Sequence, residues 1–255
     1  MAQFLPPASG IVTFLTDFGI QDPYVGVMKG AALRSYRDAR IVDVTHAVPP
    51  QDLRTAAFFV GELIDRFPNG TVHTVVVDPG VGSERRPICL ATAGVYFIGP
   101  DNGVFESLFG RDEVEIREID VESLRLPEPS PTFHGRDVFA PIAGSLARGQ
   151  FGFRALGQRI SDPVRLENRG ASVLLFADHF GNLITDQRAS DHPDASSLRC
   201  GGQEFAIQRT YSDVAEGEAL ALVSSFGTFE IAVRGGSAAE RFGLAPGQQV
   251  EILTA

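Results

Sequence analysis

Cysteine is scarce in this chain, since Cys89 and Cys200 are the only two among 255 residues. They lie far apart, and neither belongs to a C-x-x-C pair or a cysteine–histidine cluster, so we expect neither a disulfide framework nor a zinc site. No segment approaches the roughly 20 apolar residues that a membrane helix needs. The N-terminal residues also lack a basic stretch followed by an apolar run, which is the pattern of a secretory signal. The sequence therefore predicts a cytoplasmic protein with no membrane partner.

Several nucleotide and hydrolase signatures are missing as well. The chain has no G-x-S-x-G elbow, no phosphate loop ending in Gly-Lys-Ser/Thr and no G-x-G-x-x-G at the start of a helix. The stretch DPGVG has the glycines of a phosphate loop but lacks the lysine. Binding of a nucleoside triphosphate is therefore not expected.

Positive charge is also in short supply. Lysine and arginine together number 22 against 32 acidic residues, which gives a net charge of −10, and Lys29 is the only lysine. This balance disfavours nucleic acid or an anionic membrane as the main partner. A small cationic or zwitterionic ligand fits it better.

The first 160 residues alternate between strand and helix patterns. The predicted elements are strands at 11–16, 41–46 and 71–78 and helices at 24–36 and 52–67. Such alternation is typical of a largely parallel sheet with right-handed crossovers. After about residue 165 short β runs separated by Gly- and Asp-containing turns replace the helical periods. We therefore predict an α/β N-terminal domain over residues 1–160 and a smaller all-β C-terminal domain over residues 168–255.

Three predicted strands end on an aspartate, at Asp17, Asp78 and Asp178. Ligands of open α/β sheets bind outside the carboxyl ends of the strands, so these acids suggest one polar site assembled from distant segments. Asp22 follows Asp17 at the mouth of the first strand-to-helix connection. Carboxylates there could accept hydrogen bonds from the hydroxyls of a ribose or pair with an ammonium group. Alternatively, Asp17 caps a turn and Asp22 caps the helix that begins near Tyr24.

Asp78 and Arg85 flank the turn PGVGSE, which is tight enough to bring a carboxylate and a guanidinium together. Such a pair would keep Asp78 ionised and able to accept a hydrogen bond from water. An ordinary salt bridge across a turn is the alternative.

His134 follows a loop that carries three prolines between residues 127 and 131. A loop this rigid could hold the imidazole at a site, as a proton acceptor or a group that orients water. Asp137 is expected to cap the helix over 138–149, with Pro141 in its first turn, so Arg136 and Asp137 are interpreted as structural.

A fourth group of polar residues begins at Asp178, in the motif DHFGNLITD. An amide at Asn182 beside the ring of Phe180 suits a purine, through edge hydrogen bonds and stacking. An Asx-turn is the alternative for this motif, and Ser225, in SSFGTFEIAV, is similarly ambiguous.

Taken together, five motifs resemble, in the same order, those of the S-adenosyl-L-methionine hydroxide adenosyltransferases. They are TDFGIQDPYVGVMKG, VVDPGVGSERR, TFHGRD, DHFGNLITD and SSFGTFEIAVRGGSAAE, and they span nearly the whole chain. The resemblance implies an N-terminal α/β domain joined to a barrel-like β domain. It implies homotrimers that bind S-adenosyl-L-methionine between the N-domain of one subunit and the C-domain of the next. The implied reaction, without metal or cofactor, is attack of water or hydroxide at the ribose C5′, releasing adenosine and L-methionine.

The same resemblance assigns roles to residues of this chain. Asp78, Arg85 and His134 are implied to be catalytic, Asp17 to bind the ribose, Asp22, Asp178 and Ser225 the methionine end, and Phe180 and Asn182 the adenine. Asp78 and His134 would orient or deprotonate the water, and Arg85 would set the local field.

Two other functions stay open as alternatives. The related fluorinases and chlorinases attack with a halide, which the Asp78 carboxylate would repel. They also carry an extra loop, a hydroxyl residue where this chain has Gly135, and, in the fluorinases, a tryptophan where it has Gln51. The second alternative is a sensor that binds S-adenosyl-L-methionine or adenosine without turnover. The presence of Asp78, Arg85 and His134 together argues against a sensor.

Overall fold

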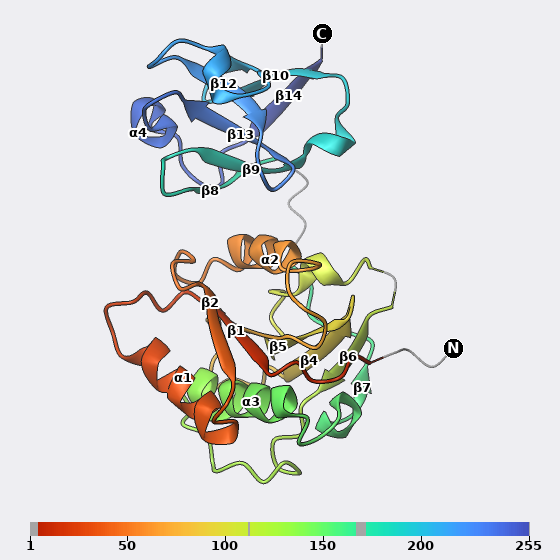
Figure 1. Ribbon diagram of the computed structural model, residues 1–255. Helices are drawn as coiled ribbons and strands as arrows, with labels where there is room; N and C mark the ends of the chain where they lie inside the picture. Colours follow the sequence, from red (N-terminus) through yellow and green to blue (C-terminus); the bar gives the residue numbers. More distant parts are fainter. Residues whose placement is uncertain (1–4, 112, 167–171, 255) are drawn as a thin grey trace. The chain divides into compact units, whose positions relative to one another are not determined.

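The computed structural model describes residues 5–111, 113–166 and 172–254. The chain divides into two compact units, Met1–Glu167 and Asn168–Ala255 (Figure 1).

The first unit is built on a seven-stranded mixed sheet with the order β2-β1-β3-β5-β4-β6-β7. Its strands are β1 (Ile11–Thr16), β2 (Arg40–Thr45), β3 (Val72–Val76), β4 (Pro87–Thr92), β5 (Val95–Pro100), β6 (Glu115–Glu118) and β7 (Arg159–Ile160). Strands β2, β1, β3 and β5 pair in parallel, whereas β4 pairs antiparallel with both β5 and β6, and β7 antiparallel with β6. The prediction of a mostly parallel sheet is confirmed, and the antiparallel additions make the sheet mixed.

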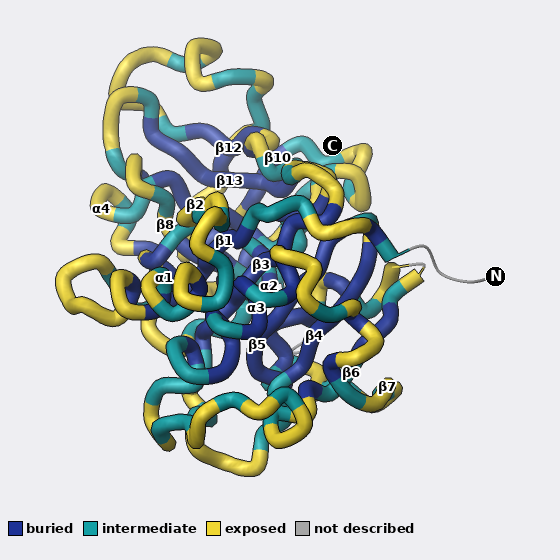
Figure 2. The backbone as a smooth tube through the Cα atoms, turned by 60° about the horizontal axis from the view of Figure 1, so that its bottom comes forward, coloured by how far each residue is buried: buried dark blue, intermediate teal, exposed yellow. Residues whose placement is uncertain are grey.

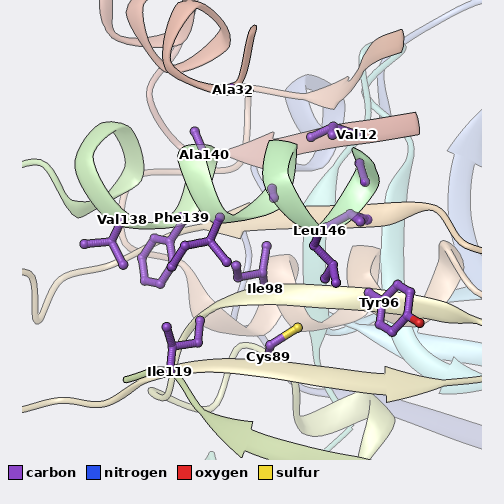
Figure 3. Packing of buried hydrophobic residues seen from close by; sticks show 14 of the residues in the cluster. Val12, Ala32, Cys89, Tyr96, Ile98, Ile119, Val138, Phe139, Ala140 and Leu146 are labelled. Atoms are coloured by element: carbon purple, nitrogen blue, oxygen red, sulfur yellow. The ribbon is translucent and has the colours of Figure 1, made fainter. Parts of the chain in front are cut away.

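Helices cover both faces of this sheet. Figure 1 shows α1 (Tyr24–Ser35) and α3 (Ala140–Arg148) on one face and α2 (Leu53–Glu62) on the other. Side chains alternate between the faces, so Val12 packs in the core under α1 and α3 (Figure 3), and Leu15 packs in the core under α2. Strands β3, β4 and β5 are buried almost throughout, as Figure 2 shows. The central strands therefore form a rigid base for whatever lies at their ends.

The starts and ends of the helices differ in part from the predictions. Helix α2 ends at Glu62 rather than at Phe67, and the Asp52 carboxylate caps its start by accepting from the backbone N–H groups of Arg54 and Thr55. Helix α1 has Pro23 at its N-cap without a side-chain hydrogen bond, so the alternative role of Asp22 as a cap is wrong.

The predicted cap at Asp137 is also wrong. A π-helical turn, η2 (Gly135–Phe139), leads into α3, so Asp137 lies inside the helical segment rather than before it. Its backbone N–H donates to the carbonyl of Phe133. Its carboxylate accepts from the Ser130 N–H at 2.9 Å and pairs with Arg136 at 2.6 Å. Asp137 therefore fastens the proline-rich loop to the helix start.

The second unit is all β apart from short helical turns. Its four-stranded sheet has the order β12-β13-β9-β8 and its three-stranded sheet the order β11-β10-β14. The strands are β8 (Leu174–Ala177), β9 (Leu183–Arg188), β10 (Ala195–Cys200), β11 (Gln203–Ala206), β12 (Ala219–Val223), β13 (Thr228–Val233) and β14 (Val250–Thr254). All pairs within these two sheets are antiparallel, and the short helix α4 (Ala238–Phe242) packs against the same core. Closure of these sheets into a barrel stays a prediction.

Within the described ranges, none of the helices combines the length and the apolar composition of a membrane-crossing segment.

Candidate active site

A cavity of about 440 Å³ opens at the carboxyl ends of β1 and β3, and its lining includes Asp17, Asp78 and His134. The two strands are parallel neighbours, and their last paired residues are Thr16 and Val76. The next residues therefore leave the sheet side by side and bring Asp17 and Asp78 to one edge, where α/β sheets bind ligands. The structure thus brings together three of the residues selected from the sequence.

Asp78 and Arg85 form a two-pronged ion pair across their turn. Arg85 Nε lies 3.0 Å from both carboxylate oxygens of Asp78, and Arg85 Nη2 lies 2.5 Å from Oδ2. The side chains are only 8% and 5% exposed, for Arg85 and Asp78 respectively, which sets this pair apart from a surface salt bridge. The planar guanidinium holds the carboxylate in one orientation, so Asp78 presents its remaining lone pair in a fixed direction.

The same guanidinium also reaches His134. Arg85 Nη2 lies 2.8 Å from His134 Nδ1, and the Arg85 guanidinium carbon lies 5.4 Å from the centre of the Phe139 ring. Because arginine only donates hydrogen bonds, Nδ1 of His134 must accept, which leaves the imidazole proton on Nε2. Burial, and then the positive charge of Arg85, hold the pKa of His134 below its ordinary value. His134 is therefore a neutral imidazole that offers an Nε2–H donor.

Asp17 holds a strained residue at the rim of the cavity. Its Oδ2 accepts from the backbone N–H of Gln51 at 2.8 Å, and Gln51 has a left-handed φ of 63°. Both residues line the cavity. A non-glycine residue adopts this conformation only where its surroundings enforce it, and such residues gather at functional sites. Asp17 therefore shapes the cavity wall besides contributing a carboxylate to it.

Three aromatic rings that the sequence analysis missed form another wall of the cavity: Phe18, Tyr24 and Phe133. They meet edge to face, with ring centres 5.4 to 6.2 Å apart. Phe18 directly follows Asp17 and Phe133 directly precedes His134. Adjacency to these polar residues was the signal that could have found Phe18 and Phe133. Such a wall suits the apolar or aromatic part of a small ligand.

The remaining residue predicted from the first unit, Asp22, is exposed and is not among the residues that line this cavity.

In the second unit, Asp178 forms the Asx-turn that the sequence analysis kept as an alternative. Its Oδ1 accepts from the backbone N–H groups of Phe180 and Asn182, both at 2.9 Å, and its Oδ2 accepts from Asn182 Nδ2 at 3.0 Å. Asn182 is buried, whereas Phe180 is 73% exposed and Ser225 is exposed. An aromatic ring this exposed next to a rigid turn is available to contact a ligand.

Both cysteines are free and buried. In the part of the chain that the structure describes, no group of three or more His, Cys, Asp or Glu side chains is arranged to hold a metal ion.

Both units match domains of one known protein family. Residues 12–157 match the SAM hydroxide adenosyltransferase N-terminal domain, and residues 173–251 match the C-terminal domain of the same family. An (R)-S-adenosyl-L-methionine hydrolase of Thermus thermophilus is 37% identical over 95% of this chain and 99% of its own length. A fluorinase of Nocardia brasiliensis is 27% identical over 95% of this chain and 96% of its own length. The crystal structure of an uncharacterized conserved protein from Thermotoga maritima superposes with a TM-score of 0.86 at 36% identity, over 95% of this chain and 100% of that one. The chain belongs to the SAM hydroxide adenosyltransferase family.

Proposed function

We propose that this protein hydrolyses S-adenosyl-L-methionine to adenosine and L-methionine. The observation that carries the proposal is the chain of contacts at the edge of the cavity, which runs from Asp78 through Arg85 to the half-buried His134. The hydrolase of Thermus thermophilus is 37% identical to this chain, whereas the fluorinase of Nocardia brasiliensis is only 27% identical over the same share of the chain. Because those hydrolases are named for the R epimer of the substrate, that epimer is the first to test.

The proposed reaction is a single displacement at the ribose C5′. The oxygen of water forms a bond to C5′, the C5′–S bond breaks, and its electron pair stays on sulfur as the thioether of L-methionine. One proton of the water is released. A sulfonium leaves without protonation, so the site needs no acid, metal or cofactor, only a positioned water.

In the proposed mechanism the three residues divide the catalytic work. Arg85 makes three contacts with the Asp78 carboxylate, which has about four lone-pair sites, so one remains to accept a hydrogen from water. His134 donates through Nε2–H and orients the attacking oxygen, rather than deprotonating it, because Nδ1 already accepts from Arg85. Arg85 itself cannot act as a base and serves to align the other two.

The proposal extends to how the substrate is held. Asp17 would bind the ribose hydroxyls, and the rings of Phe18, Tyr24 and Phe133 would border the apolar part of the ligand. The family resemblance assigns the methionine end to Asp22, Asp178 and Ser225 and the adenine to Phe180 and Asn182. It also supports a barrel-like second domain, a homotrimer and sites shared between neighbouring subunits. We further propose a cytoplasmic location, which the scarcity of cysteine favours. Light scattering after size exclusion, with and without substrate, tests the trimer.

Halogenation is the weaker alternative for two physical reasons. The ionised Asp78 in the cavity would repel an incoming halide. At Gly135, a Cβ would lie 3.0 Å from Met28 Sδ, so the hydroxyl residue of the halogenases would fit there only if the Met28 side chain shifted. Both features favour water as the nucleophile.

The test is to incubate purified protein with each separated epimer of S-adenosyl-L-methionine in halide-free buffer, and again with added chloride or fluoride. Products are identified by chromatography and mass. Adenosine and methionine without halide support hydrolysis, and Asp78→Ala and His134→Ala should abolish turnover while ligand binding persists. A 5′-halo product would overturn the assignment of Asp78, and tight binding without any product would make the protein a sensor.

A further inference from the structure

We infer that the dipeptide Asp101–Asn102 positions the Asp78–Arg85 pair by binding both ends of the turn between them. The inference rests on the proposed function only for its kinetic consequence. Neither residue lines the cavity, so both are positioning residues rather than catalytic ones.

Asn102 binds the residue before Asp78. The pairing of β3 with β5 extends only to Thr74 and Ile98. The next residues of β5 are Gly99 and Pro100, and proline has no N–H to donate to the continuation of β3. Asn102 donates instead, from Nδ2 to the carbonyl of Val77 at 2.9 Å.

The orientation of the Asn102 amide is fixed by its second contact. Its Oδ1 accepts from the Val104 N–H at 3.2 Å, so the nitrogen must face Val77. Val77 is completely buried, so loss of the amide would leave its carbonyl without this partner away from water.

Asp101 binds the residue after Arg85. Its Oδ2 accepts from Arg86 Nε at 2.9 Å and Nη2 at 2.6 Å, and its backbone N–H donates to the Arg86 carbonyl at 2.9 Å. Its Oδ1 accepts from the Val164 N–H at 2.8 Å. The Asp101 side chain is 1% exposed. Arg86 is thereby held through both its side chain and its backbone by a single buried residue.

The topology explains why two adjacent residues can reach both ends. Strand β5 lies between β3 and β4, and its last residue Pro100 pairs with Pro87, the first residue of β4. The carboxyl end of β5 therefore lies between the end of β3 and the start of β4. The turn begins at Asp78 and ends at Arg85. Val77 directly precedes it and Arg86 directly follows it. A shift at either end changes where the carboxylate and the guanidinium meet.

The test compares Asn102→Ala and Asp101→Asn with a matched control, Ser107→Ala. Ser107 Oγ donates to the backbone carbonyl of Ala57 at 2.7 Å, so the control also removes one side-chain bond to a carbonyl of the same unit. Steady-state kinetics with S-adenosyl-L-methionine give kcat and KM, and thermal unfolding shows whether each variant folds. In ligand-free protein, the NMR signal of the Arg85 Nε–H group, identified by its loss in Arg85→Lys, reports the ion pair directly.

We expect Asn102→Ala and Asp101→Asn to lower kcat by as much as about 10²-fold with KM little changed, and to shift the Arg85 Nε–H signal. Ser107→Ala should keep both the wild-type kcat and the wild-type signal. The inference is overturned if the Asn102 and Asp101 variants also keep the wild-type kcat and the wild-type Arg85 signal. It is likewise overturned if Ser107→Ala lowers kcat as much as those two variants do. If the wild-type protein does not turn over substrate, the proposed function fails, and the Arg85 signal alone then decides on positioning.

Discussion

Arg85 donates to both Asp78 and His134, with Nη2 lying 2.5 Å from Asp78 Oδ2 and 2.8 Å from His134 Nδ1. One guanidinium thus fixes the orientation of a carboxylate and the tautomer of an imidazole. The two outer residues are coupled through the central one, so substitutions of the three should be far from additive.

Replacement of His134 by its two amide analogues separates its two nitrogen atoms. His134→Asn can keep an acceptor near Nδ1 for Arg85 but loses the donor at Nε2, whereas His134→Gln can keep a donor near Nε2. If Nε2–H orients the attacking water, kcat should fall by about 10²–10³-fold in the Asn variant and by less in the Gln variant. Single-turnover rates with S-adenosyl-L-methionine measure this. The reverse order would mean that contact with Arg85 is the whole role of His134.

The pH dependence of kcat/KM should reflect the depressed pKa of His134. Burial and the charge of Arg85 favour the neutral imidazole, so protonation requires a lower pH than the ordinary histidine value of about 6.5. Activity that depends on the neutral ring should persist as pH falls through that value and be lost only below it. The acidic limb should vanish from the residual activity of His134→Asn. An acidic limb that stays unchanged in that variant would assign it to another group.

Gln51→Gly should stabilise the fold and weaken substrate binding. Glycine adopts the φ of 63° without strain, but it also gives the unfolded chain more conformational freedom. The net effect should raise the free energy of unfolding by up to about 1 kcal/mol. The same freedom loosens the cavity rim, so KM should rise. Asp65→Gly is the control, because Asp65 is exposed with a φ of 61°, and it should leave KM unchanged. Denaturant unfolding and initial rates give the two quantities, and an unchanged KM in Gln51→Gly would contradict the role of the rim.

Gly135→Ala should crowd the helix start at Met28. The new Cβ would lie 3.0 Å from Met28 Sδ, which is closer than carbon and sulfur normally approach, and overpacking of this kind typically costs about 1–3 kcal/mol. Met28→Ala removes the δ atom that the new Cβ would contact, so the double variant should be more stable than the sum of the two single changes predicts. Additive free energies of unfolding would show that the thioether moves aside without strain.

Stability should fall in mild acid because of His73. Burial lowers the pKa of His73 to about 3, its Nδ1 lies 2.8 Å from Thr13 Oγ1, and its ring stacks on Phe97. Above pH 6.5 the ring is neutral in both states and makes no difference. Below that pH the unfolded chain takes up a proton that the folded protein refuses, so the free energy of unfolding falls by about 1.4 kcal/mol per pH unit until about pH 3.

Denaturant unfolding at a series of pH values checks this contribution. His73→Leu should lower the free energy of unfolding at neutral pH. Between pH 6.5 and 4.5 its free energy of unfolding should fall less steeply than that of the wild type, by about 1.4 kcal/mol per pH unit. His179→Gln, which alters an exposed histidine, should follow the wild type. Parallel curves for wild type and His73→Leu would contradict the assignment.

Local pattern predicted those parts of the fold that depend on near neighbours in sequence. The strand ending at Thr16, the helix starting at Tyr24 and the strand leading to Asp78 are confirmed, because apolar periodicity determines them. The antiparallel pairing of β4 with β6 was missed because it depends on contacts between distant segments. The cap at Asp137 failed for a local reason, since the adjacent Arg136 and the N–H of Ser130 take up its carboxylate. The three-ring wall was missed because Phe133 joins Phe18 and Tyr24 only after folding.

That wall has a practical consequence for optical measurements. The chain contains no tryptophan and only four tyrosines, and one of these, Tyr24, lines the cavity. Tyrosine emission is therefore not masked by indole, and a ligand that stacks near Tyr24 should quench a measurable share of it. Subtracting the signal of a Tyr24→Phe variant would isolate that share. The cavity thus carries its own fluorescent reporter, which allows the affinity for adenosine, or for S-adenosyl-L-methionine in the Asp78→Ala variant, to be titrated without a label.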